Sequence, residues 1–157
     1  MKCVKTQGSP QPGTVLIVDD NLEDIRLTQR VTAAVCPELR VRSLHSGEEL
    51  VCYLQGEHGF SDRMEFPYPN LILLDLRMPG MHGFHVLGWL RDHPPHNLIP
   101  VVVLTASGEV LVAQQAYALG ARSFLTKPIG ANDFKETMVK FEGRPDGLSK
   151  ESGSAPN

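Results

Sequence analysis

The stretch NLILLDLRMPGMHG, residues 70–83, decides the fold class of this chain of 157 residues. It begins with a continuous apolar run, residues 70–75, that ends in the carboxylate of Asp75. An apolar run without polar alternation is typical of a strand with both faces buried, as in a parallel sheet covered by helices. The proline and two glycines within residues 78–83 favour a turn after it. The stretch therefore predicts an inner strand of an α/β domain, with Asp75 at its carboxyl end.

Four further strand-like runs surround this stretch, at residues 14–18, 39–44, 99–105 and 121–126. Helical patterns separate these strands. The first two helices are expected over residues 22–36 and from Ser46 to about Leu54. A third follows residue 83 and stops before Pro94, a fourth follows the strand at 99–105 and runs through Ala118, and the last carries the stripe of Phe134, Met138 and Phe141. Such βα units with continuous apolar strands predict a parallel sheet with right-handed crossovers. The expected fold is a flavodoxin-like, doubly wound (βα)5 domain with strand order 2-1-3-4-5.

Local signals mark the starts of two helices. Asn21 is a good N-cap for the first helix, where acidic residues follow in the first turn. Ser46 can cap the second helix, with Glu49 three residues on as a capping box. On one face of the first helix the periodicity places four apolar residues, which are expected to be buried: Leu27, Val31, Ala34 and Val35.

The composition fits one folded domain between two polar tails. Hydrophobic residues make up 41% of the chain, and 15 Lys and Arg against 18 Asp and Glu give a net charge of −3, which argues against a basic nucleic-acid-binding footprint over the whole chain. The apolar runs are too short to span a membrane. We expect a folded domain over residues 14–141, with a disordered N-terminal tail at 1–13 and a disordered C-terminal tail at 142–157.

The N-terminal sequence and the cysteines indicate a cytoplasmic protein. Residues 1–13 lack the apolar core of a secretory signal. Cys3, Cys36 and Cys52 are widely spaced and form neither a CxxC motif nor an even disulfide framework. We therefore expect a reducing compartment, with Cys36 and Cys52 as buried or half-buried thiols.

Polar side chains end four of the predicted strands: Asp19 and Asp20 the first, Asp75 the third, Thr105 the fourth, and Thr126 followed by Lys127 the fifth. Because the carboxyl ends of parallel strands lie at one edge of a sheet, we expect these side chains to converge there. Two unit charges about 4 Å apart interact by roughly 4 kcal/mol at an effective dielectric near 20, so three carboxylates need a cation among them. Oxygen ligands without sulfur favour a hard cation such as Mg²⁺.

This arrangement predicts phosphoryl chemistry. Asp75 stands alone at a central strand end and is the candidate nucleophile, which would give an aspartyl-phosphate. The paired Asp19 and Asp20 suit metal binding, Asp20 directly and Asp19 through a water. The Lys127 ammonium and the Thr105 hydroxyl would bind phosphoryl oxygens.

Four motifs carry a family resemblance. They stand in the order and spacing of a response-regulator receiver domain: VLIVDDN at 15–21, LILLDLRMPGMHG at 71–83, VVVLTAS at 101–107 and SFLTKPI at 123–129. Each motif alone is weak evidence, but four together at strand ends form a specific signal. The chain resembles the family over residues 14–141, and the resemblance implies a signalling phosphoacceptor of a two-component system rather than an enzyme.

The resemblance implies a role for each matching residue. Asp75 would accept the phosphoryl group from a phosphohistidine of a sensor histidine kinase. Asp19, Asp20, Asp75 and the backbone carbonyl of Arg77 would hold Mg²⁺.

The same resemblance implies a phosphoryl-binding pair and a switch. Thr105 and Lys127 would bind the phosphoryl group, and Phe124 would turn inward when Thr105 moves. Phe124 lacks the hydroxyl of the tyrosine that is frequent at this position, so it cannot act through a hydrogen bond. The Lys127–Pro128 peptide bond is expected to be cis.

A narrower resemblance concerns the partners. The long loop at residues 56–69, preceded by YLQGEHG, resembles the stand-alone regulators that serve bacterial phytochrome kinases. A sensor histidine kinase of this kind is the expected partner, and neither nucleic acid nor a membrane is expected to bind. The family also implies a homodimer through the last two βα units, where Leu111, Val112 or Tyr117 could form an apolar surface.

Three other functions remain as alternatives. A small Mg²⁺-dependent phosphatase with an aspartyl nucleophile commonly needs a second acid two residues after the nucleophile, where this chain has Arg77. A flavin or nucleotide carrier of the same fold would need a glycine-rich phosphate loop after the first strand, where this chain has the acidic DDNLED. A phosphate-independent interaction module would not need the complete acidic set.

Overall fold

The computed structural model describes residues 13–106 and 110–142 of the chain. Strands and helices alternate along it: β1 (Thr14–Val18), α1 (Leu22–Val35), β2 (Arg40–Leu44), α2 (Gly47–Gln55), β3 (Leu71–Asp75), α3 (Gly83–Asp92), a short 3-10 turn η1 (His96–Leu98), β4 (Val101–Thr105), α4 (Val110–Ala118), β5 (Ser123–Thr126) and α5 (Ala131–Glu142). The predicted tails, residues 1–13 and 142–157, lie almost wholly outside the described residues.

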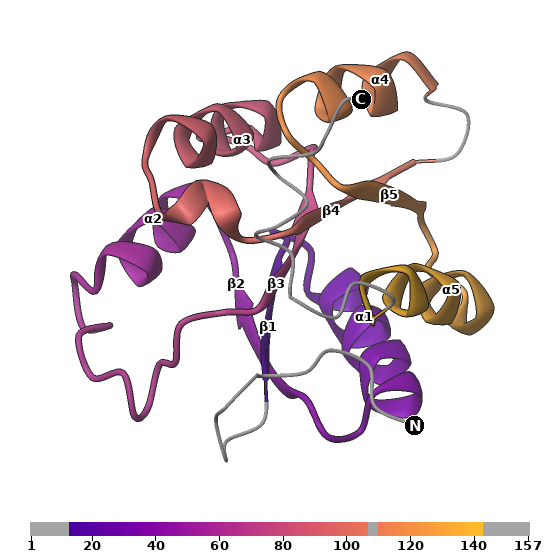
Figure 1. The fold of residues 1–157 in the computed structure, drawn as a ribbon, viewed down its shortest axis with the longest axis horizontal. Helices are drawn as coiled ribbons and strands as arrows, with labels where there is room; N and C mark the ends of the chain where they lie inside the picture. Colours follow the sequence, from indigo (N-terminus) through magenta and orange to yellow (C-terminus); the bar gives the residue numbers. More distant parts are fainter. Residues whose placement is uncertain (1–12, 107–109, 143–157) are drawn as a thin grey trace.

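All the strands pair in parallel within one sheet, in the order β2-β1-β3-β4-β5 (Figure 1). This order confirms the predicted flavodoxin-like α/β fold. The chain moves outward from β1 to β2 on one side and starts again with β3 on the other, so the strand order reverses between β1 and β3. In such a sheet the carboxyl ends of these two strands flank the crevice where ligands bind.

Helices cover both faces of the sheet (Figure 1). Helices α1 and α5 pack on one face and α2, α3 and α4 on the other. Alternate residues of each strand serve the two cores: Leu16, Val18, Ile72, Leu74, Val101 and Val103 face α2 to α4, and Val15, Ile17, Leu71, Leu73, Val102 and Leu104 face α1 and α5. Burial on both faces explains why the strand sequences are continuously apolar.

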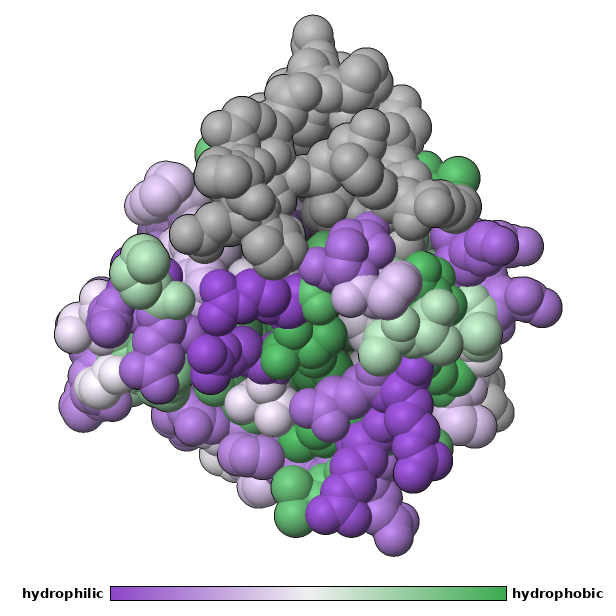
Figure 2. Space-filling model, turned by 90° about the horizontal axis from the view of Figure 1, so that it is seen from below, coloured by the Kyte–Doolittle hydropathy of each residue, from purple (hydrophilic) through white to green (hydrophobic). Residues whose placement is uncertain are grey.

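One face of the molecule shows the mixed, mainly polar surface expected where helices bury their other side. The side of the molecule shown in Figure 2 is largely hydrophilic, with smaller hydrophobic areas between polar side chains. Within the described residues, no helix has both the length and the apolar character needed to cross a membrane.

Side-chain caps fix the starts of α1 and α2 as predicted. Asn21 Oδ1 accepts a hydrogen bond from the backbone N–H of Asp24 at 3.0 Å. Ser46 Oγ accepts one from the backbone N–H of Glu49 at 3.0 Å, and Glu49 Oε1 accepts one from the backbone N–H of His45 at 2.7 Å. The first cap matters most for function, because it fixes the helix that starts just after Asp19 and Asp20, the two acidic residues that follow β1.

The predicted buried face of α1 is only partly correct: Val31 and Val35 are partly buried against the core, whereas Leu27 and Ala34 are exposed. Leu27 is 46% exposed, and the helix instead buries Ile25, Thr28 and Thr32. The threonines are tolerated in the core because the Thr32 hydroxyl donates a hydrogen bond to the Thr28 carbonyl at 2.8 Å. A count of apolar residues at helical spacing therefore selected the wrong face by about a quarter of a turn.

The prediction that Cys36 and Cys52 are both thiols is wrong for Cys36 and confirmed for Cys52. Cys36, at the end of α1, is fully buried and disulfide-bonded, and its partner is not among the described residues. Cys52 on α2 is a free, partly exposed thiol, as expected.

Candidate acidic functional site

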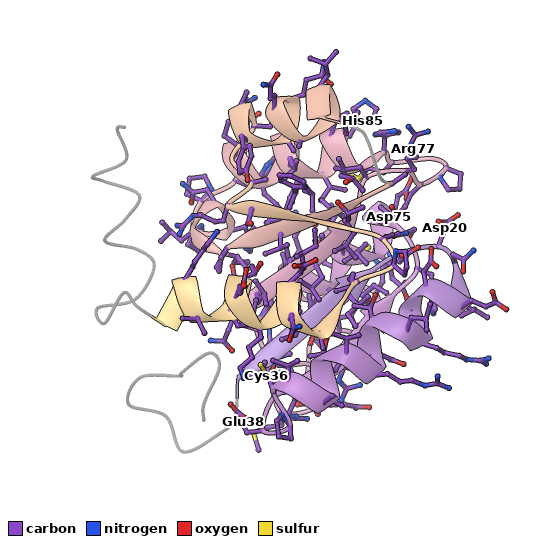
Figure 3. The ribbon with its side chains drawn as sticks, turned by 90° about the vertical axis from the view of Figure 1, so that its right-hand side faces the viewer. Asp20, Cys36, Glu38, Asp75, Arg77 and His85 are labelled. Carbon is purple, nitrogen blue, oxygen red and sulfur yellow. The ribbon has the colours of Figure 1, made fainter. Side chains whose placement is uncertain are left out.

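The strand ends bring the predicted side chains to one edge of the sheet. Asp20, Asp75 and Arg77 lie together at this edge, whereas Cys36 and Glu38 lie at the other end of the strands (Figure 3). The strand register places Asp75 beside Leu104, so that Thr105 extends one residue further toward the edge. Thr105 in turn pairs with Thr126, and Lys127 follows directly.

Three carboxylates form an acidic cluster here. Asp19, Asp20 and Asp75 each offer an oxygen within 4.8 Å of the others. Asp19 is fully buried, Asp75 is 5% exposed, and Asp20 faces solvent. Asp20 can therefore exchange water for a ligand, while the other two carboxylates lie in a medium that screens their repulsion poorly.

The oxygen atoms of Asp19 differ in their contacts. Oδ1 accepts a hydrogen bond from the backbone N–H of Asn21 at 3.0 Å. Oδ2 is buried and accepts no aligned hydrogen bond from the described residues. A buried carboxylate oxygen with unused lone pairs, next to two further carboxylates, fits a hard divalent cation that takes oxygen ligands.

One ammonium offsets part of this negative charge. Lys127 Nζ lies 3.0 Å from Asp19 Oδ2 and 3.3 Å from Asp75 Oδ1. It also lies 2.9 Å from Asp24 Oδ2, to which it donates a hydrogen bond. The backbone N–H of Lys127 donates to the Thr105 carbonyl at 2.7 Å, which fixes the start of this side chain against β4.

The titration behaviour reflects an excess of negative charge. Burial and the neighbouring Asp19 raise the pKa of Asp75 to about 6, although the Lys127 ammonium and the backbone N–H of Arg77 act in the opposite direction. Burial would lower the pKa of Lys127, but its close contacts with the Asp24 and Asp19 carboxylates and the charge of Asp75 raise it above the ordinary lysine value. Lys127 therefore stays charged, and the cluster still gains from a further cation.

The loop after β3 is held close to Asp75. The backbone N–H of Arg77 lies 3.3 Å from Asp75 Oδ1. Gly83 returns to the strand end so closely that a Cβ there would lie 2.5 Å from Leu76 Cα. At the loop tip, the backbone N–H of Met81 donates to Glu48 Oε2 on α2 at 3.1 Å. The turn that the sequence predicts is thus fixed at both its base and its tip.

The predicted switch residues lie on neighbouring strands. Thr105 is buried, whereas the Phe124 side chain on β5 is 38% exposed. The Phe124 ring meets Tyr117 of α4 edge-on, with ring centroids 6.1 Å apart. The Lys127–Pro128 peptide bond is cis, as the family resemblance implies.

Sequence reasoning missed two residues of this region. Asp24 contacts Lys127 although the sequence gives it an ordinary role as an acidic residue in the first turn of a helix. Glu48 holds the loop after β3 from the start of α2. Both stand in the first turns of helices that follow strand ends, and this position is the signal that could have identified them, since helices start at the same edge where strands end.

Comparison with known proteins assigns the chain to a family. The family model described as "Response regulator receiver domain" matches residues 15–139, which is nearly the whole described chain. The sequence is 35% identical over 136 residues to the response regulator Rcp1 of Synechocystis sp., covering 85% of this chain and 89% of that protein.

Solved structures agree with this assignment. The Mn²⁺-bound form of the response regulator Rcp1 is similar with a TM-score of 0.68 and 32% identity, covering 85% of this chain and 94% of the other. The bacteriophytochrome response regulator AtBRR is similar with a TM-score of 0.74 and 30% identity, covering 83% and 92%. The chain therefore belongs to the response regulator receiver domains of two-component systems, which are signalling phosphoacceptors rather than true enzymes.

Proposed function

We propose that the chain is a single-domain response regulator that accepts a phosphoryl group on Asp75. The observation that carries this proposal is the position of the Asp75 carboxylate, which is 5% exposed, lies beside two other carboxylates and is 3.3 Å from the Lys127 ammonium. A receiver domain implies a sensor histidine kinase as its partner. The donor is then a phosphohistidine of that kinase.

In the proposed step, a carboxylate oxygen of Asp75 attacks phosphorus and forms a P–O bond. The P–N bond to the imidazole breaks, and its electron pair stays on the histidine nitrogen. The phosphoryl oxygens would be bound by Lys127, whose ammonium is already at the carboxylate, and by the Thr105 hydroxyl. These donors act on charge that is spread over the transferring group.

We propose Mg²⁺ as the cofactor, held by Asp19, Asp20, Asp75 and the backbone carbonyl of Arg77. The unused lone pairs of Asp19 Oδ2 and the exposed position of Asp20 support this ligand set. A bound Mg²⁺ would supply positive charge to the phosphoryl oxygens. A solved relative holds Mn²⁺, a cation of similar ligand preference.

The proposed output is a change of protein-interaction surface on α4, β5 and α5. Thr105 and Phe124 are the proposed switch, and the outward Phe124 ring would have room to move once Thr105 turns toward the phosphoryl group. Exposed apolar side chains lie on these elements: Leu111, Tyr117, Phe124 and Val139. They support a homodimer through the last two βα units, as the resemblance implied.

We further propose that the kinase is a bacterial phytochrome and that the protein works in the cytoplasm. The similarity to the phytochrome response regulator RcpA and to two bacteriophytochrome response regulators supports the kinase class. Alkylation of Cys36 in cells lysed directly into denaturant, where its burial is lost, would support the cytoplasm, and its protection there would contradict it.

The test is phosphorylation by acetyl phosphate, followed by intact-mass analysis. With Mg²⁺ the wild type should gain the mass of one phosphoryl group, and chelation of the metal should abolish the gain. Asp75→Asn should gain none, and it keeps the size of the side chain. Release of free phosphate in many turnovers from ordinary phosphate esters would instead support the phosphatase alternative. An unchanged mass of the wild type would contradict the proposed phosphorylation.

A further inference from the structure

The contact between Lys127 and Asp24 is not explained by the acidic cluster. Asp24 is not one of the three clustered carboxylates. Its Oδ2 lies 2.9 Å from Lys127 Nζ, the shortest of the three carboxylate contacts of this ammonium. It is also the contact with hydrogen-bond geometry, whereas Asp19 Oδ2 accepts no aligned hydrogen bond.

We propose that Asp24 is a positioning residue that holds the Lys127 ammonium in the unphosphorylated protein and competes with the phosphoryl group for it. This inference rests on the proposed phosphorylation of Asp75. It assigns a regulatory role to a residue that contacts neither the metal site nor the nucleophile directly.

The ammonium has no donor to spare before phosphorylation. An ammonium has three N–H donors, and Lys127 has three carboxylates within 3.3 Å. A phosphoryl group on Asp75 adds nearly two negative charges and three acceptor oxygens. The contact with Asp75 becomes a contact with its own phosphoryl group, whose three oxygens can accept more than one N–H and so draw the ammonium away from Asp19 or Asp24.

Burial decides which partner is lost. The Asp19 side chain is fully buried, so losing the ammonium would leave a charge without compensation from water. The Asp24 side chain is 35% exposed and can be hydrated. Asp24 also stands in the first turn of α1, where the helix N-terminus stabilises a carboxylate in the absence of a lysine. Asp24 is therefore the partner that the phosphoryl group displaces.

The consequence is a selective stabilisation of the unphosphorylated state. The Lys127–Asp24 contact exists before phosphoryl transfer and is lost when the ammonium turns to the phosphoryl oxygens. Removing it should therefore speed phosphorylation and slow the loss of the phosphoryl group. For a partly exposed ion pair we expect an effect of about two- to fivefold.

The experiment compares initial phosphorylation rates with acetyl phosphate and Mg²⁺ for the full chain and its variants. Asp24→Asn should be phosphorylated about two- to fivefold faster than the wild type. Asp24→Glu keeps the carboxylate and should return the rate toward that of the wild type. A structural defect in α1 would lower the rate instead, so the direction of the change separates the two explanations.

Glu23→Gln is the matched control for charge. It removes one negative charge from the same helix turn, and Glu23 is not an ion-pair partner of Lys127 among the described residues. Its rate should stay near that of the wild type. An equal acceleration in Glu23→Gln and Asp24→Asn, or an unchanged or slower rate in Asp24→Asn, would overturn the competition.

A double-mutant cycle in metal-free urea unfolding tests the contact without phosphorylation. The single variants Asp24→Asn and Lys127→Gln and the double variant should together yield a favourable interaction energy between Asp24 and Lys127. No coupling would also overturn the inference. If the coupling is present but the wild type is never phosphorylated, the proposed function fails, and the competitive role fails with it.

Discussion

Removal of the Asp75 charge should stabilise the metal-free protein. The pKa of Asp75 is raised from 3.8 to about 6, because burial and Asp19 outweigh the attraction of Lys127. The folded protein therefore binds more protons than the unfolded chain between about pH 4 and pH 6, and its stability falls as the pH rises through this window. Near pH 7 the folded state carries the whole penalty.

The size of the effect follows from the shift. A rise of about two pKa units corresponds to about 3 kcal/mol, which is the upper limit for Asp75→Asn, since asparagine resembles the protonated carboxyl. We expect a gain of about 1–3 kcal/mol in the free energy of unfolding at pH 7.5. In a domain of this size this corresponds to a rise in Tm of roughly 4–12 °C.

The assay is urea unfolding of wild type and Asp75→Asn in a chelating buffer at pH 7.5 and pH 5. The difference in the free energy of unfolding between Asp75→Asn and the wild type should shrink to about half at pH 5, where the folded wild type is largely protonated at this site. Saturating Mg²⁺ should also reduce this difference. Asp92→Asn, which changes an exposed carboxylate on α3, should alter stability by less than about 0.5 kcal/mol. An Asp75→Asn variant that is no more stable than the wild type at pH 7.5 would refute the reasoning.

Three further predictions concern the elements that build the site. Lys127→Gln should destabilise the metal-free protein by about 2 kcal/mol in urea unfolding, because two buried carboxylates lose their ammonium. Mg²⁺ should restore part of this stability, and a variant as stable as the wild type without metal would contradict the contacts of Lys127. Gly83→Ala should lower the free energy of unfolding by at least about 2 kcal/mol and slow phosphorylation, because its Cβ would lie 2.5 Å from Leu76 Cα. Gly88→Ala on the same helix, where the added Cβ meets open space, should raise the free energy of unfolding by up to about 1 kcal/mol. Thermal unfolding that ranks these two variants in the opposite order would contradict this packing. Asn21→Ala removes the cap of α1 and should lower the free energy of unfolding by about 1 kcal/mol, and a neutral result would show that the cap is not needed.

The sequence predicted the fold and the acidic cluster for the same physical reason. Continuous apolar strands require a covered parallel sheet, and a parallel sheet gathers the residues at its strand ends. Asp19, Asp20, Asp75 and Lys127 could therefore be placed together without coordinates, and the structure does bring them together.

The errors arose where one residue type has two common uses. The α1 face was misplaced because Thr28 and Thr32 are polar in a hydropathy count but are buried, the Thr32 hydroxyl donating to the helix backbone. Asp24 was missed because an acidic residue in a first helix turn already has an ordinary explanation. Its contact with Lys127, 103 residues away, depends on tertiary packing of α1 beside the end of β5.

Locating the phosphoryl group tests the central claim most directly. The wild type would be treated with acetyl phosphate and Mg²⁺, the acyl phosphate reduced with borohydride, and the modified peptide sequenced by mass spectrometry. We predict modification at Asp75 alone, and none after chelation of the metal. Modification at Asp19, Asp20 or Asp24, or an undiminished yield at Asp75 without any divalent cation, would contradict the account.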